Sequence, residues 1–127
     1  MGAEDRPVIL STGDGGLWYH LSEIETAVRW GVKVVVVLND NRSLNEETPF
    51  YKPMYGGTLS GRHEELWKFT EVDFAAVARS LGANGLRVTK PADFVPALEK
   101  ALDSDRLTIV DTVTDIDALC PWGTTYN

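Results

Sequence analysis

Four short runs rich in valine, isoleucine, leucine and threonine recur along the chain, with helix-patterned segments between them. They predict strands at residues 7–12, 33–39, 85–89 and 107–113. Such nearly continuous apolar runs are typical of a parallel sheet that is covered on both faces. The order of elements therefore predicts an α/β fold of three layers, a mostly parallel sheet with helices on both faces, in a single domain over residues 1–127.

The intervening segments carry helix signals. In residues 17–30, apolar side chains recur with the 3.6-residue period of a helix that packs on a sheet, and Glu25 and Arg29 are spaced to pair on its outer side. Asp73 resembles the N-cap of a helix that ends before Gly82. A last helix is expected to begin near Asp93, which would place Pro96 in its first turn.

Composition indicates an ordinary soluble domain. The 127 residues are 43% apolar and 24% charged, and the net charge of −7 argues against nucleic acid or an anionic membrane as a partner. The only cysteine cannot form an internal disulfide. No apolar stretch approaches the roughly 20 residues that span a bilayer. We therefore expect a cytoplasmic protein.

The most informative motif is Gly13-Asp14-Gly15-Gly16 at the end of the first predicted strand, with Asn41 27 positions after Asp14. About 14 helical residues at ~1.5 Å each advance ~21 Å. About seven strand residues at ~3.3 Å each return ~23 Å. Because these paths nearly cancel, Asp14 and Asn41 are expected to meet at the carboxyl ends of neighbouring parallel strands, where open α/β sheets bind ligands.

The residue types at that meeting point favour a particular ligand. A carboxylate, an amide oxygen and a main-chain carbonyl are hard donors that suit Mg²⁺ or Ca²⁺. The amides of Gly15, Gly16 and Leu17 would open a helix and face an anion. Together they describe a metal-bridged diphosphate. The alternative is an acidic strand-to-helix turn that holds no ligand.

The same residues resemble a known signature. Gly13-Asp14-Gly15, followed by residues 23–29 and by Asn39-Asp40-Asn41, is similar to the diphosphate-binding motif of thiamine-diphosphate-dependent enzymes, acetolactate synthase-like in particular. The resemblance implies that Asp14, Asn41 and the main-chain oxygen of Ser43 bind Mg²⁺. It also implies that the cofactor-binding residues are Gly13, Asp14, Gly15, Gly16, Leu17, Asn41, Ser43 and Leu44. Asp40 replaces the usual first asparagine of the motif and adds negative charge near the metal.

The resemblance implies an activity as well, that of a lyase or transferase that decarboxylates a 2-oxo acid and joins the product to a second carbonyl. It further implies that this C-terminal domain is truncated at its N-terminus. A pyrimidine-binding domain or chain would supply the activating acid, so the chain alone is expected to be inactive, and a homo-oligomer is expected. The alternative is a non-catalytic interaction module that exposes Leu17, Trp18 and Tyr19.

Two further expectations concern the remaining chain. Residues 42–69, rich in proline and glycine, form the least regular segment and are expected to be a mobile loop. Asp111, Asp115 and Asp117 are interpreted as strand-end and surface charges rather than as a metal cluster.

Overall fold

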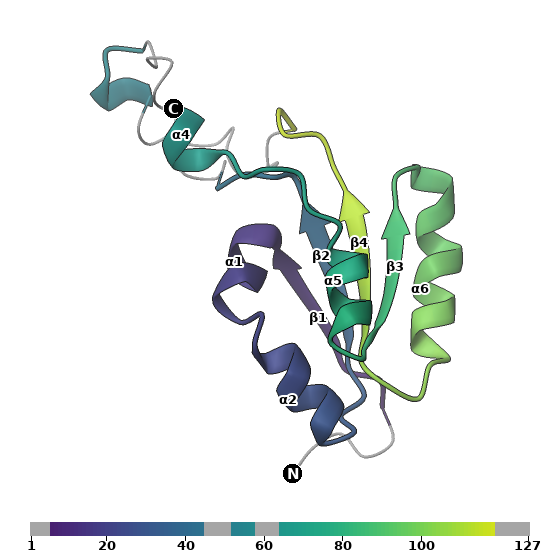
Figure 1. The fold of residues 1–127 in the computed structure, drawn as a ribbon. Helices are drawn as coiled ribbons and strands as arrows, with labels where there is room; N and C mark the ends of the chain where they lie inside the picture. The colour runs from purple at the N-terminus through teal and green to yellow at the C-terminus, as the bar shows by residue number, and fades with distance from the viewer. Residues whose placement is uncertain (1–5, 45–51, 58–63, 119–127) are drawn as a thin grey trace.

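The four predicted strands form one parallel sheet in the order β1-β2-β4-β3 (Figure 1). They are β1 (Ile9–Gly13), β2 (Val35–Asp40), β3 (Asn84–Val88) and β4 (Thr108–Val113). The structure is a computed structural model that describes residues 6–44, 52–57 and 64–118. Each observed strand agrees with its predicted position to within two residues at either end. The sheet is therefore the part of the fold that the apolar pattern predicts best.

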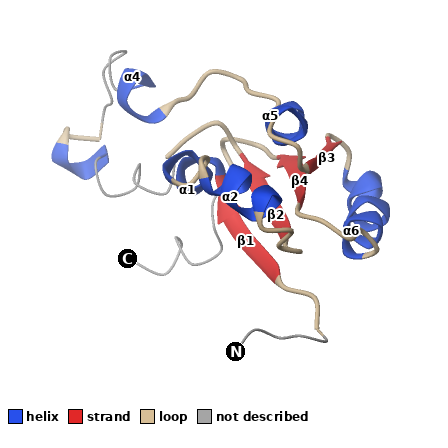
Figure 2. Ribbon diagram, turned by 60° about the horizontal axis from the view of Figure 1, so that its bottom comes forward, coloured by secondary structure: helices blue, strands red, loops and turns tan. Residues whose placement is uncertain are grey.

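Helices cover both faces of this sheet (Figure 2). The helices α1 (Asp14–Tyr19), α2 (Glu23–Arg29) and α5 (Phe74–Ser80) share a core with Val36, Leu38 and Ile109. The helix α6 (Phe94–Leu102) packs on the opposite face, against Val35 and Val110. Neighbouring residues of β2 thus enter different cores, as the alternation of a strand requires. The expected three-layer α/β fold is confirmed.

The first helical segment differs from the prediction. Instead of one helix over residues 17–30, the chain forms α1 and α2, separated by a turn at residues 20–22. No proline or glycine marks this break. Both short helices bury a side chain in the same core, Leu17 from α1 and Ile24 from α2. The expected pair on the outer surface is present, with Arg29 Nε 3.2 Å from Glu25 Oε1.

The signals for the later helices are confirmed. Asp73 caps α5, since its Oδ1 accepts a hydrogen bond from the amide of Ala76 at 2.7 Å. Gly82 follows the helix with a φ of 87°, the left-handed conformation that ends many helices. A short 3-10 helix, η3 (Pro91–Asp93), precedes α6, and Pro96 lies in the first turn of α6.

Only part of the predicted mobile loop lies within the described residues, so its mobility stays a prediction. The described part includes α4 (Glu64–Trp67) and an antiparallel bridge between Ser43 and Lys68.

Among the described helices, none has the length and apolar character that a membrane crossing needs. The cytoplasmic location likewise stays a prediction.

Candidate functional site

The register of the sheet places two aspartates side by side at its carboxyl edge. Gly13, the last residue of β1, pairs with Asn39 of β2, so Asp14 and Asp40 each come one residue after a paired position. Asp14 begins α1, and Asp40 is the last residue of β2. The parallel pairing confirms that the chain returns to the same edge after the first helical segment, as the sequence predicts.

Asp14 is buried with one carboxylate oxygen unused. The residue is 2% exposed, and its Oδ1 accepts a hydrogen bond from the amide of Gly15 at 2.8 Å. Within the described residues Oδ2 has no hydrogen-bond partner. Burial raises the pKa of Asp14 above its ordinary value, and the negative charge of Asp40 raises it further, whereas the Gly15 amide lowers it. A buried oxygen of this kind can accept a hydrogen bond or bind a cation.

The loop after β2 turns back toward Asp14. Arg42 has a φ of 59°, which is uncommon for a residue other than glycine. Ser43 Oγ donates a hydrogen bond to the carbonyl of Trp67 at 2.9 Å, which anchors the loop. The main-chain amides of Arg42 and Ser43 lower the pKa of Asp14, so they face its carboxylate. The loop that contains the predicted ligand Ser43 therefore lies near Asp14.

Asn41 occupies the start of this loop, and its side chain has a local partner. Its Oδ1 accepts a hydrogen bond from the amide of Ser43 at 3.1 Å, an Asx turn that shapes the loop. A carbonyl oxygen has two lone pairs, so this bond leaves room for a second interaction. The structure therefore places Asn41 in the loop that faces Asp14, and its role as a metal ligand stays a prediction.

The other residues predicted to bind the cofactor have packing roles in the structure. A side chain on Gly15 would overlap the side chain of Leu44, and one on Gly16 would overlap Thr12 Oγ1. Leu17 is 5% exposed and belongs to the core, so the expectation that it is exposed is wrong. The helix α1 has only six residues, which limits the dipole that it could offer to an anion.

Near this edge, an ion pair with a buried acid and a partly buried base joins β3 to β4. Arg87 Nη1 lies 2.8 Å from Asp111 Oδ2, and it also donates to the carbonyl of Val72 at 2.9 Å. Asp111 is 0% exposed, so its interpretation as a surface charge is wrong. Asp115 and Asp117 are exposed, as expected. An acid within the apolar run of β4 and a base within that of β3 were the signals that could have predicted this pair.

Burial and the Arg87–Asp111 pair shift the pKa values of the acids near this edge. Burial raises the pKa of Asp111 to about 6, with Arg87 lowering it and Asp40 raising it. Burial also raises the pKa of Asp40, with Arg87 again the leading opposing charge. Three buried acids therefore lie near one another, Asp14 at the start of α1, Asp40 at the end of β2 and Asp111 within β4, with Arg87 beside Asp111.

The donors at this edge fit a hard divalent cation. Asp14 and Asp40 are buried carboxylates whose unused oxygens are the preferred ligands of Mg²⁺ and Ca²⁺. In the part of the chain that the structure describes, no group of three or more histidine, cysteine or acidic side chains is arranged to hold a metal ion. Carbonyl, amide or ligand oxygens would therefore have to complete the coordination shell.

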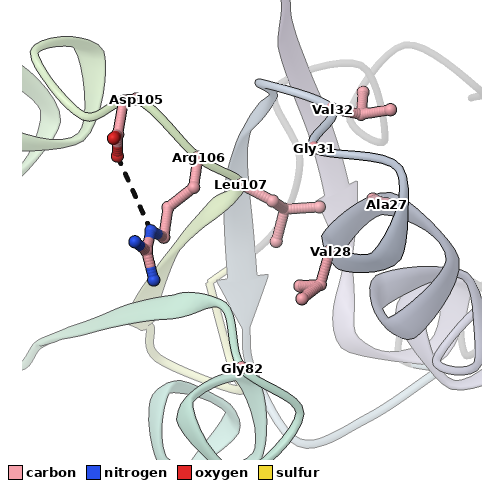
Figure 3. Close-up of a pocket in the computed structure, with 8 residues that line it drawn as sticks. All are labelled: Ala27, Val28, Gly31, Val32, Gly82, Asp105, Arg106 and Leu107. Carbon is pink, nitrogen blue, oxygen red and sulfur yellow. Dashed lines mark ion pairs between the residues drawn. The ribbon is translucent and has the colours of Figure 1, made fainter.

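A separate hollow of about 340 Å³ lies at the opposite, amino-terminal edge of the sheet (Figure 3). Its walls include Val28, Val32 and Leu107. At one side of the hollow, the Nε of Arg106 lies 3.6 Å from the Oδ1 of Asp105. Ligands of open α/β sheets bind at the carboxyl ends of the strands, and this hollow lies at the other end. It is therefore distinct from the edge where Asp14 and Asp40 meet.

A parallel α/β sheet with polar groups gathered at its carboxyl edge defines a ligand-binding α/β domain. The chain belongs to the family described as "Thiamine pyrophosphate enzyme, C-terminal TPP binding domain", which matches residues 1–112. Thiamine pyrophosphate is the same compound as thiamine diphosphate. The resemblance inferred from the glycine and asparagine motifs is confirmed at the level of the family.

The relatives include several enzymes. The acetolactate synthase large subunit IlvG of Mycobacterium tuberculosis is 34% identical over 116 residues, which are 91% of this chain and 20% of that protein. The sulfoacetaldehyde acetyltransferase of Castellaniella defragrans is 34% identical over 111 residues, which are 85% and 18% of the two chains.

The chain is also similar to the solved structure of a thiamine diphosphate-dependent enzyme. The thiamine diphosphate-dependent 4-hydroxybenzoylformate decarboxylase of Rhodococcus jostii RHA1 superposes with a TM-score of 0.78 at 27% identity, over 91% of this chain and 21% of that one. The chain thus spans about a fifth of the length of the proteins that it matches.

Proposed function

We propose that the chain binds Mg²⁺ and thiamine diphosphate at the carboxyl edge of its sheet. The metal ligands would be the Asp14 carboxylate, the Asn41 amide oxygen and the main-chain oxygen of Ser43. The residues around the diphosphate would be Gly13, Gly15, Gly16, Leu17 and Leu44. The observation that supports the proposal best is the buried Asp14 carboxylate, whose Oδ2 has no partner among the described residues and which faces the Arg42–Ser43 main chain.

The parent reaction we infer is the decarboxylation of a 2-oxo acid followed by carboligation, as in an acetolactate synthase-like enzyme of the cytoplasm. Thiamine diphosphate supplies the carbanion stabilisation in such chemistry. The residues of this chain would hold the metal and the diphosphate and keep the cofactor in place. A pyrimidine-binding domain or a second chain would complete the site within an oligomer, so the chain alone would be inactive.

Calorimetry with Mg²⁺ and thiamine diphosphate tests the binding. Wild-type protein should give a saturable heat, and Asp14→Ala should remove it, because Asp14 supplies the one carboxylate of the proposed ligand set. Asp105→Ala is the matched control, since it makes the same change at a side chain that is 89% exposed at the other edge of the sheet. Equal heats from wild type and Asp14→Ala would refute a specific site.

The alternative, an interaction module, is supported by Tyr19, which is 80% exposed, and by Trp18, which is 40% exposed although its ring contacts Phe74. Leu17 no longer supports it, because that side chain is buried. Sedimentation with and without the cofactor separates the two functions. Self-association that does not depend on Mg²⁺ or thiamine diphosphate, together with an absence of stabilisation by them, would favour the module.

A further inference from the structure

Asp40 is a deeply buried carboxylate at the carboxyl edge of the sheet, and the main-chain amide of Arg42 lowers its pKa. It is 1% exposed, and neither Oδ1 nor Oδ2 has a partner within the described residues. Its neighbour Asp14 also has an unused buried oxygen. Gly13 pairs with Asn39 in the sheet, so Asp14 and Asp40 follow paired positions at the ends of neighbouring strands. An unpaired buried carboxylate costs several kcal/mol in general, and two that face each other cost more.

The basic side chains nearby leave Asp40 without an ion pair. Arg87 is held by Asp111 at 2.8 Å and by Glu71 at 3.1 Å. Arg42 lies near enough to lower the pKa of Asp40. However, among the described residues no ion pair joins Asp40 to Arg42 or Arg87, and Arg42 Nε is itself buried without a partner. The oxygens of Asp40 therefore remain available to a cation.

We propose that Asp40 is a second carboxylate of the cation site and faces Asp14 across the ends of β1 and β2, so that the chain binds a divalent cation without any diphosphate. The proposal rests on the proposed function, because it concerns the same edge of the sheet. The affinity of an oxygen site for a divalent cation rises with the number of charged ligands. A second carboxylate would strengthen the binding of the cation and so make it less dependent on phosphate oxygens.

The direct test measures the binding of Mn²⁺ to the full chain by electron paramagnetic resonance in the absence of phosphate compounds. Titration with Mg²⁺ then shows whether the two cations compete. Wild type should bind Mn²⁺ in competition with Mg²⁺. Asp40→Asn should raise the dissociation constant for Mn²⁺ by about tenfold or more, because the substitution removes one full negative charge from the site. Asp105→Asn should bind like wild type.

Thermal unfolding gives a second measurement, and its wild-type arm does not depend on whether the variant folds. In EDTA, Asp40→Asn should unfold at a higher temperature than wild type, because it removes an unpaired buried charge. With Mg²⁺ in excess, the wild-type midpoint should rise and that of Asp40→Asn should rise less. A wild-type midpoint that does not respond to Mg²⁺ alone would contradict the proposal, even if the variant failed to fold.

The outcomes separate this proposal from the proposed function. If wild type binds Mg²⁺ together with thiamine diphosphate but binds neither Mg²⁺ nor Mn²⁺ alone, the role of Asp40 is refuted and the proposed function stands. If Asp40→Asn binds Mn²⁺ as tightly as wild type does, the role of Asp40 is refuted as well. If wild type binds the cations alone but not with thiamine diphosphate, the second carboxylate is supported and the proposed function fails.

Discussion

Arg87 of β3 and Asp111 of β4 form an ion pair in which the acid is fully buried and the base partly buried, with Nη1 2.8 Å from Oδ2. The register places them directly opposite each other on neighbouring strands. Arg87 also reaches the segment before α5 through the carbonyl of Val72. The amide of Ala75 in the first turn of α5 lies 3.4 Å from Asp111 Oδ2. The pair therefore ties two strands and one helix together beside the candidate site.

Removing the base of this pair should be costly. We expect Arg87→Met to lower the free energy of unfolding by roughly 2–4 kcal/mol, because Asp111 would remain buried with its charge uncompensated. Urea unfolding at pH 7 measures the loss. The control is Arg29→Met, which breaks the exposed pair with Glu25 and should cost less than about 1 kcal/mol. Similar losses in both variants would show that the buried pair contributes little.

The stability of the protein should depend on pH through Asp111. Its pKa in the folded state is about 6, against an ordinary value of 3.8. In this window the folded state binds more protons than the unfolded state, so stability is present at low pH and is lost as pH rises toward 6. The change corresponds to about 2–3 kcal/mol. The loss continues through pH 6 and is complete once the pH lies well above 6, where Asp111 is ionised in both states.

Comparison with Asp111→Asn isolates this contribution from those of the other acids. Urea unfolding of both proteins in EDTA, at intervals between pH 4 and pH 7, gives the difference in their free energies of unfolding. Wild type should lose stability relative to Asp111→Asn as pH rises. A difference that stays constant with pH, or one that moves in the opposite direction, would show that Asp111 is not a high-pKa acid in the folded protein.

The sequence predicted the strands well and the site only in part. Continuous apolar runs mark β1 to β4 because both faces of a parallel sheet are buried, and Asp73 marks the start of α5 through its own side chain. These are local signals. The break between α1 and α2 has no such signal, because it depends on how Leu17 and Ile24 both reach the core beneath them.

The buried charges depend on partners far away in the sequence. Asp111 and Arg87 are 24 residues apart, and although each interrupts an apolar run, only the pairing of β3 with β4 brings them together. Asp14 was recognised from the glycines around it, which is a local motif. The sequence predicted that Asp40 adds charge at this edge, but the burial of both of its oxygens without a partner among the described residues depends on tertiary packing. Local patterns thus predicted which edge carries the candidate site, and tertiary packing determined the charge of that edge.

Gly85 of β3 should be the least replaceable glycine of the sheet. A side chain there would overlap the main-chain carbonyl group of Ala75 in α5, and main chain cannot move aside as a flexible side chain can. We expect Gly85→Ala to cost about 3 kcal/mol or more in the free energy of unfolding, or to prevent folding. The matched control is Gly13→Ala, because the nearest atom to a side chain there is 3.9 Å away.

Circular dichroism with urea unfolding compares the two alanine variants. Gly13→Ala should fold and lose at most about 1 kcal/mol, since its backbone φ of −87° suits any residue. If Gly85→Ala matched Gly13→Ala in stability, the close approach of α5 to β3 would be absent from the folded protein in solution.

Asn41 can be tested as a residue with two separable roles, in the loop and in the proposed metal site. Asn41→Ala should lower the free energy of unfolding by about 1 kcal/mol, because the Ser43 amide loses the acceptor that lies 3.1 Å away. Asn41→Asp retains an acceptor oxygen at that position and should preserve the loop. Urea unfolding without metal or cofactor measures this first role.

The second role requires Mg²⁺ and thiamine diphosphate together. Both should raise the thermal midpoint of wild type and of Asn41→Asp, since a ligand that binds only the folded state stabilises it. Asn41→Ala should show little or no rise, because it lacks the proposed metal-binding oxygen. If Asn41→Ala rises as much as wild type while Asp14→Ala does not rise, the metal is held by Asp14 without Asn41, and the ligand set inferred from the motif is wrong at that position.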